Sequence, residues 1–116
     1  DVHIKAAQKV NIIQVPDGGG GRYDVRPDFG NIFQITANVN AEITMSSIVS
    51  TNYGQSGTII LVNGPGGTNW QQLPANMLTP SGADINFNTD PNAVAIISFL
   101  ITNTGEVLCN YVGHFA

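Results

Sequence analysis

Residues 33–46 alternate strictly between apolar and polar side chains, and this pattern constrains the fold more than any other stretch of the chain. Side chains of a strand point alternately to its two faces, so the stretch predicts a strand with one buried and one solvated face. A single strand of this length is unusual. We therefore expect a bend or tight corner at Asn38-Val39-Asn40, because asparagine tolerates left-handed backbone angles.

Further strands separated by turn sequences make up the rest of the chain. We predict strands at residues 10–15, 58–62, 69–73, 84–88, 93–102 and 107–115. Four consecutive glycines at residues 18–21 predict a wide loop or linker, and residues 46–55 predict a polar loop. Since no helical period lasts more than a turn or two, the chain is predicted to be all-β, an antiparallel β-sandwich or jelly-roll-like domain.

The same alternation predicts which side chains fill the core. We expect Gln34, Thr36 and Thr44 on the solvated face, and a nearly solvent-free set made of Phe33, Ile35, Ile43, Ile60, Ile97 and Phe99. Cys109, the only cysteine, lies within an apolar strand pattern and is expected to be a small buried hydrophobe.

Composition excludes two classes of partner. The chain of 116 residues suits one domain, and only 10% of its residues are charged, with a net charge of −4. Its basic residues are Lys5, Lys9, Arg22 and Arg26, whereas nucleic-acid binding needs a cluster of cations for the phosphates. No apolar run approaches the ~20 residues of a membrane helix. We therefore expect neither nucleic-acid binding nor membrane insertion.

Residues 1–26 differ from the remainder and are predicted to form an amino-terminal arm or linker before a β-domain at residues 27–116. They hold all four basic residues and the four-glycine run. We expect this arm to reach away from the β-domain toward another subunit or protein. Because the chain begins with Asp1 instead of Met, we also expect it to be part of a longer protein.

No motif in the sequence predicts catalysis, a metal or a cofactor. Nucleophilic catalysis needs an activated Ser or Cys with a base and an orienting acid, and no such motif is present. His3 and His114 stand at opposite ends of the chain, and the acid and amide residues of 84–92 favour turn chemistry over a weak calcium site. Carboxylates for glycoside hydrolysis would have to come from Asp24, Asp28, Glu42, Asp84, Asp90 and Glu106. We predict a protein that is not an enzyme and holds no cofactor.

Aromatic residues flanked by amides are the side chains that stack on sugars and hydrogen-bond to them. Tyr53 with Asn52, and Trp70 with Asn69, are therefore candidate ligand-facing loop residues. A core position is the alternative for Trp70, since a single tryptophan is generally well buried.

Four segments resemble a known family by their order. They are Asn-Ile-Phe-Gln-Ile-Thr-Ala-Asn-Val-Asn-Ala-Glu-Ile-Thr-Met (31–45), Gly-Gln-Ser-Gly-Thr-Ile-Ile-Leu-Val (54–62), Gly-Gly-Thr-Asn-Trp (66–70) and Asp-Pro-Asn-Ala-Val-Ala-Ile-Ile-Ser-Phe (90–99). The series is similar to a β-module at the ends of bacteriophage tail-fibre and other virion structural proteins, including those of cyanophages. The resemblance implies a structural role in the virion, an extracellular particle, and a homotrimer. Residues 1–26 would then contact other virion proteins, and surface loops would contact a host glycan.

Two segments indicate self-association without reference to any family. Residues 58–62 and 93–101 are apolar on both faces, which is more than one small core can cover. In the trimer that the resemblance implies, we expect contacts from Ile59, Leu61, Tyr111 and Phe115. The prediction is a trimeric phage tail-fibre, spike-tip or capsid-decoration protein. The alternative is a monomeric carbohydrate-binding module, and the oligomeric state in solution separates the two.

Overall fold

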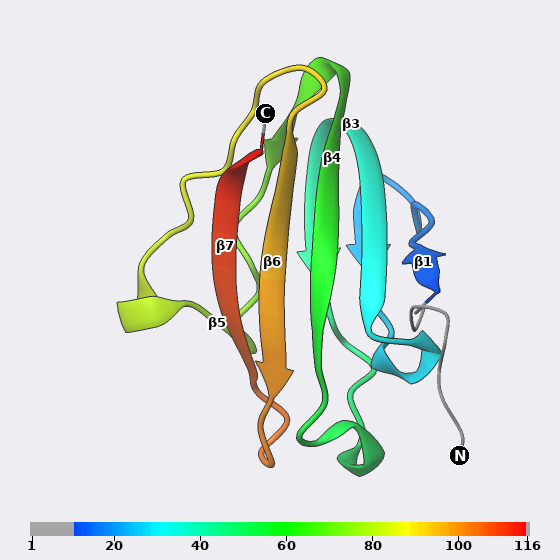
Figure 1. The fold of residues 1–116 in the computed structure, drawn as a ribbon, viewed down its shortest axis with the longest axis vertical. Helices are drawn as coiled ribbons and strands as arrows, with labels where there is room; N and C mark the ends of the chain where they lie inside the picture. Colours follow the sequence, from blue (N-terminus) through cyan, green and yellow to red (C-terminus); the bar gives the residue numbers. More distant parts are fainter. Residues whose placement is uncertain (1–10, 116) are drawn as a thin grey trace, which may run out of the picture.

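The computed structural model describes residues 11–115, which form an all-β fold as predicted (Figure 1). The strands are β1 (Ile12–Gln14), β2 (Arg22–Asp24), β3 (Ile32–Thr44), β4 (Ser56–Trp70), β5 (Met77–Leu78), β6 (Val94–Ile101) and β7 (Val107–Phe115). Helical structure in this part of the chain is limited to short 3-10 turns at Pro27–Phe29, Ser50–Asn52 and Pro80–Gly82. None of these turns has the length or apolar character to cross a membrane.

The sheet mixes parallel and antiparallel pairs. Its order is β1-β3-β4-β6-β7-β5, and β2 pairs with the carboxyl-terminal part of β3. β6 is antiparallel to both β4 and β7, and the predicted turn at residues 103–105 joins β6 to β7. β3, however, runs parallel to β1, β2 and β4, and β5 runs parallel to β7. The prediction of an antiparallel fold is wrong for these pairs.

The path of β3 explains the parallel pairing. The strand runs along the front of the molecule, turns a corner and returns in a second layer behind the front strands, and β4 follows the same path beside it (Figure 1). Because the chain leaves β3 at the end of the molecule where it entered, the connection at residues 45–55 starts β4 parallel to β3 without a helical crossover. β1 and β2 trace an equivalent path, and Arg22 pairs with Glu42, 20 residues further along the chain.

The corner of β3 falls at the expected position, but Val39 adopts the left-handed conformation and neither asparagine does. The φ angle of Val39 is 52°, and its side chain is 71% exposed. Across the corner the partner in β4 changes from Asn63 to Thr68, so the Gly-Pro-Gly-Gly segment between them bulges outward. The predicted strands at 58–62 and 69–73 are therefore parts of one bent strand that ends at Trp70.

The buried side chains form one cluster to which the front and rear parts of the bent strands both contribute. Five of the six predicted core residues are confirmed: Phe33, Ile35, Ile43 and Ile97 are 0% exposed, and Phe99 is 3% exposed. Ile60 is the error, because Ile59 and Leu61 face the core while Ile60 is only partly buried on the opposite face. Four of the five residues at 58–62 are apolar, so the segment itself does not reveal which set points inward.

Residues 11–26 belong to the sheet, so the expected arm is wrong for the part of it that the structure describes. Val15, Tyr23 and Val25 lie in the buried cluster. The backbone N–H groups of Val15 and Val25 donate to Gln34 and Thr44 of β3, at 2.9 and 2.8 Å. Burial in the core removes these apolar side chains from water, and this hydrophobic contribution to stability holds the segment against β3. Residues 1–10 lie outside the described residues.

Residues 84–88 do not form the predicted strand. Side chains, instead of a neighbouring strand, accept hydrogen bonds from backbone N–H groups of this segment. Ile85 N–H donates to Gln72 Oε1 and Asn88 N–H to the Tyr111 hydroxyl, each at 2.8 Å. The apolar position at Phe87 in the alternating pattern is nevertheless buried, and its ring lies between Trp70 and Tyr111. The segment therefore packs beside β7 as an irregular loop.

Candidate functional site

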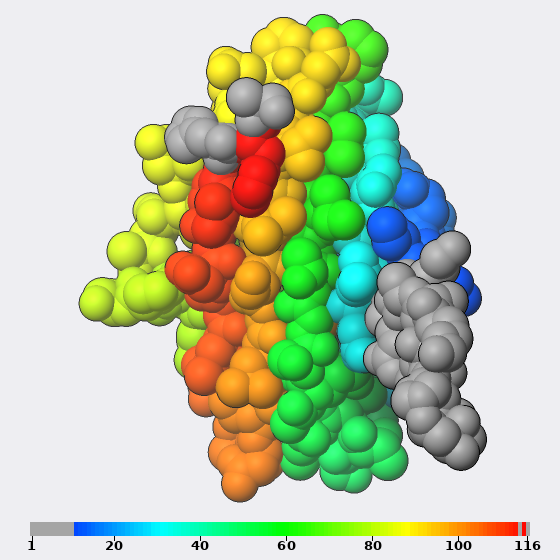
Figure 2. All heavy atoms as spheres, in the orientation of Figure 1, coloured from blue at the N-terminus to red at the C-terminus, as the bar shows by residue number. Residues whose placement is uncertain are grey.

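The front of the sheet is an uncharged surface, which we call the outer face. It consists of the outward side chains of β1, β6 and β7 and of the front parts of β3 and β4. Strands β4, β6 and β7 lie side by side in Figure 2. No Asp, Glu, Lys or Arg occurs among the outward residues that the structure describes. They are Ile12, Gln14, Ile32, Gln34, Thr36, Ser56, Thr58, Ile60, Val62, Val94, Ile96, Ser98, Leu100, Leu108, Asn110, Val112 and Phe115.

Apolar side chains are aligned across the outer face. Strand pairing places Ile60 opposite Ile96 and Ile96 opposite Val112. The next row joins Val62, Val94 and Phe115. We call these six residues the apolar stripe; Val112 is 46% and Phe115 47% exposed, and the other four are partly buried. Contiguous exposed apolar surface of this kind marks an interaction site in soluble proteins.

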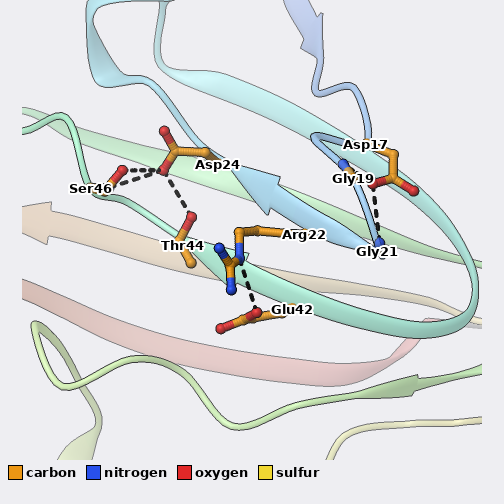
Figure 3. Close-up of polar contacts among 8 residues, drawn as sticks. All are labelled: Asp17, Gly19, Gly21, Arg22, Asp24, Glu42, Thr44 and Ser46. Carbon is orange, nitrogen blue, oxygen red and sulfur yellow. Dashed lines mark hydrogen bonds and ion pairs between the residues drawn. The ribbon is translucent and has the colours of Figure 1, made fainter.

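The opposite side of the molecule carries a polar network between β2 and the rear part of β3 (Figure 3). Arg22 Nε donates to Glu42 Oε1 at 3.2 Å. Asp24 Oδ1 accepts hydrogen bonds from the hydroxyls of Thr44 and Ser46, both at 2.9 Å, and from the Ser46 backbone N–H at 3.0 Å. Arg22, Asp24 and Glu42 thus lie behind the sheet, whereas the described residues of the outer face include no Asp, Glu, Lys or Arg.

The electrostatics of this network do not favour Asp24 as a general acid. Burial alone would raise the pKa of the Asp24 carboxyl, but the hydrogen bonds from Ser46 and Thr44, with the charge of Arg26, lower it below its ordinary value. A glycosidase acid needs the opposite, a raised pKa. Glu42, on the adjacent strand, is engaged by Arg22. The arrangement ties β2 to β3 and is structural in character.

The corner at Val39 is strained and held in place by its neighbours. A β-branched residue in the left-handed region costs about 1–3 kcal/mol and persists only where the surroundings enforce it. Glu42 N–H donates to the Gly21 carbonyl at 2.8 Å, and Thr68 Oγ1 donates to the Ala37 carbonyl at 2.7 Å. Gly21, itself at a φ of 81°, lies so close to the Asn40 carbonyl that no side chain would fit there.

Two hollows flank Val39 and share residues 38–40 as lining. The larger, of about 550 Å³, lies between the corner of β3 and residues 66–69 of β4, with Thr89 at its edge. The smaller, of about 270 Å³, lies on the side of Asp17 and Tyr23. We call the larger hollow the corner cleft. Within it, Asn69 Nδ2 donates to Asn40 Oδ1 at 3.3 Å.

Asn52 and Trp70 are both buried. Asn52 is 3% exposed, and its amide accepts from the Val49 N–H and donates to Asp28 Oδ1, both at 2.9 Å. Its expected ligand-facing role is wrong, because its polar atoms are used to fold the loop. Trp70 is 5% exposed and donates from Nε1 to Asn63 Oδ1 at 2.7 Å, so the core alternative is correct.

The other two candidates of this group are accessible. Tyr53 is 41% exposed on the loop that was predicted for residues 46–55. Asn69 is exposed and lines the corner cleft. The two residues lie in different regions, since Tyr53 is close to Gly105 in the turn between β6 and β7.

Some of the expected trimer contacts are likewise buried in the structure and others are accessible. Ile59 and Leu61 are 0% and 1% exposed in the chain's own core, so they cannot meet another subunit. Tyr111 is partly buried, because its ring packs edge-on to Phe87. Phe115 is exposed and belongs to the apolar stripe, since a bulge in β7 opposite Val94 and Ile96 turns its side chain outward. In β4, the two expected contact residues therefore lie on the buried face of the strand.

Among residues 11–115, no three His, Cys, Asp or Glu side chains gather closely enough to hold a metal ion. His3 and the side chain of His114 lie outside this description. Cys109 is 5% exposed, and burial raises the pKa of its thiol to about 12. It is the buried small hydrophobe that was expected.

No protein-family model matches the chain, and neither the curated proteins nor the solved structures yield a similar protein. The resemblance to virion β-modules therefore rests on the order of the sequence motifs. Function has to be argued from the two surfaces of this structure, the outer face and the corner cleft.

Sequence reasoning located the corner but did not find the cleft. Two signals were present, the Asn-Val-Asn of residues 38–40 and the Gly-Gly-Thr-Asn of residues 66–69. They line one hollow only because Val39 pairs with Thr68 and Asn40 with Asn69. That register depends on the parallel alignment of β3 and β4.

Proposed function

We propose that this chain is a non-enzymatic structural protein of a phage particle, a tail-fibre or spike tip or a capsid-decoration subunit, that forms a homotrimer through its outer face. The observation that carries this proposal is the apolar stripe on a surface without charged side chains. A closed symmetric assembly would remove this stripe from water, and its hydrophobic contact area would stabilise the trimer.

The distribution of charge supports the choice of face. Arg22, Asp24 and Glu42 lie behind the sheet, where they would stay in water when the outer faces meet. No ionised group among the described residues of the outer face would then have to be desolvated, which removes the main penalty of burying this surface. A sandwich architecture within each subunit is supported by the doubled-back β3 and β4, whose two parts contribute to one core.

The assignment to a virion is supported by the motif order of residues 31–99. A repeated subunit on an extracellular particle would display its loops for attachment to a host or for stabilising the particle. Contacts with other virion proteins through the amino-terminal region belong to the same proposal. The alternative, a monomeric carbohydrate-binding module, predicts a species of one chain's mass in solution.

Sedimentation of the full chain in molar salt tests the assembly. We expect three times the mass of one chain, a complex that survives high salt because its contact is hydrophobic, and dissociation in urea. A species of one chain's mass under the same conditions would overturn the trimer and favour the monomeric module.

A matched pair of variants then tests the face. Val112→Asp places a charge on the apolar stripe, whereas Val49→Asp makes the same change at an equally exposed valine of the loop at residues 45–55. We expect only Val112→Asp to yield monomers, because burying an unpaired carboxylate is costly. If both variants sediment as trimers, the contact lies elsewhere.

A further inference from the structure

We propose that the corner cleft beside Val39 is a binding site for a neutral carbohydrate. The inference rests on the host-attachment role proposed above, to which it adds a site and a ligand class, and it uses residues that lie off the outer face. It starts from a preorganised corner: Val39 holds a left-handed φ of 52° and is 71% exposed, although most valines avoid both conditions. A strained residue kept at the surface suggests that the conformation serves a purpose there.

The frame around Val39 is rigid. Thr68 Oγ1 donates to the Ala37 carbonyl at 2.7 Å and accepts from Gly64 N–H at 3.2 Å, which locks the bulge of β4 against β3. Thr68 is 2% exposed, so these bonds are shielded from competing water. Gly67 lies so close to the Thr89 carbonyl that only glycine fits at its position. The cleft is therefore shaped before any ligand arrives, which lowers the entropy lost on binding.

The lining of the cleft selects the chemistry of the ligand. Asn38, Asn40 and Asn69 are exposed, and each amide offers two N–H donors and a carbonyl acceptor. The hydrogen bond from Asn69 Nδ2 to Asn40 Oδ1 orients two of them and leaves the other Asn40 and Asn69 amide groups for a ligand. Sugar hydroxyls donate and accept at once, so they match amides better than a purely donating or accepting ligand does.

The charge and polarity of the lining residues restrict the class of ligand further. Among residues 11–115, no charged side chain lines the corner cleft, so an anionic or cationic ligand would gain no ion pair from them. Val39 is the one large apolar side chain in the lining, and its exposed methyl groups would contact the C–H face of a sugar ring. An extended peptide would need further apolar pockets for its side chains, which the lining lacks. A neutral glycan fits both properties.

Amide-resolved NMR of the full chain provides the test, with dextran, mannan and laminarin oligosaccharides as neutral probes and chondroitin sulfate as the charged comparison. We expect at least one neutral glycan to shift the amide signals of residues 38–40 and 66–69. Chondroitin sulfate should leave these signals in place. Absence of any shift at the corner with all three neutral probes would overturn the proposal, and so would an equal response to chondroitin sulfate.

Three alanine variants sharpen the result. Asn40→Ala and Asn69→Ala should each weaken binding about fivefold, the effect of one lost hydrogen bond. Asn103→Ala, at an exposed asparagine of the turn between β6 and β7, is the matched control and should leave the affinity unchanged. Equal losses in all three variants would contradict a site in the cleft.

Assembly and carbohydrate binding can fail separately. The cleft variants should keep the sedimenting mass of the parent chain, and Val112→Asp should lose assembly while its corner signals still respond to the glycan. Loss of the corner response in a well-folded Val112→Asp chain would show that the cleft is not an independent site.

Discussion

Ile59 and Ile60 are consecutive residues of β4 that lie on opposite faces of the sheet. Ile59 is 0% exposed and pairs with Ile97 in the core. Ile60 is partly exposed and pairs with Ile96 in the apolar stripe. Two identical side chains thus contribute to different levels of structure, the first to folding and the second to the proposed assembly.

This relationship predicts different effects of the same truncation. Ile59→Ala should lower the free energy of unfolding by about 2–5 kcal/mol, because it leaves a cavity in a packed core. Ile60→Ala should cost about 1 kcal/mol or less in the monomeric Val112→Asp background, and should weaken assembly in the parent chain. Urea denaturation followed by fluorescence measures the first effect, and sedimentation measures the second. Equal losses of stability would show that the face assignment of β4 is wrong.

The strain at Val39 predicts a stabilising substitution. Asparagine adopts left-handed angles more readily than a β-branched residue, so Val39→Asn should raise the free energy of unfolding by about 1 kcal/mol. Val49→Asn is the control, since Val49 is also exposed but has an extended backbone with a φ of −125°. The control should change stability by less than about 0.5 kcal/mol. Thermal unfolding compares the two, and a gain of the same size in both variants would argue against strain as the cause.

Asp24 predicts a dependence of stability on pH. Its folded pKa is lowered because hydrogen bonds from Ser46 and Thr44 outweigh the opposing effect of burial. A lowered folded pKa contributes stability above the unfolded value of 3.8, and this contribution disappears as the pH falls through the folded pKa. Asp24→Asn should therefore cost about 1 kcal/mol at neutral pH and almost nothing in strong acid.

Urea denaturation of the parent chain and Asp24→Asn over this acid range measures the difference directly. Asp84→Asn, at an exposed carboxylate of the loop beside β7, is the matched control for the loss of one negative charge. A cost for Asp24→Asn that stays constant from neutral pH into acid would contradict the lowered pKa.

Cys109 predicts an unreactive thiol. Burial raises its pKa from 9.0 to about 12, and only the thiolate is nucleophilic. Iodoacetamide at about pH 8 should leave the native chain unmodified and alkylate it fully in concentrated guanidinium. The pKa of the thiol is higher in the folded than in the unfolded chain. Its contribution to stability is therefore complete below about pH 9 and is lost as the pH rises toward about 12. The stability difference between the parent and Cys109→Ala should shrink over that interval, and rapid native alkylation would refute the burial.

The amino-acid sequence determined the local features of this protein. Strict alternation at residues 33–46 assigned Phe33, Ile35 and Ile43 to the core, because successive side chains of a strand point to opposite faces. The turn residues at 103–105 marked the hairpin between β6 and β7, and the corner at residues 38–40 was located from its asparagines. These features depend only on near neighbours in the chain.

Only the tertiary structure decided which face of β4 points inward, which strands run parallel and where a ligand could bind. Residues 59–62 are all apolar, so hydrophobic surface is buried whichever alternate set of side chains faces the core. Packing against β6 decides which set does so. Parallel pairing follows from β3 turning back on itself, which brings residues 20 positions apart into register. The corner cleft arises because that register sets residues 38–40 beside residues 66–69. Contacts between distant segments carry no local pattern, so they appear only when the chain is folded.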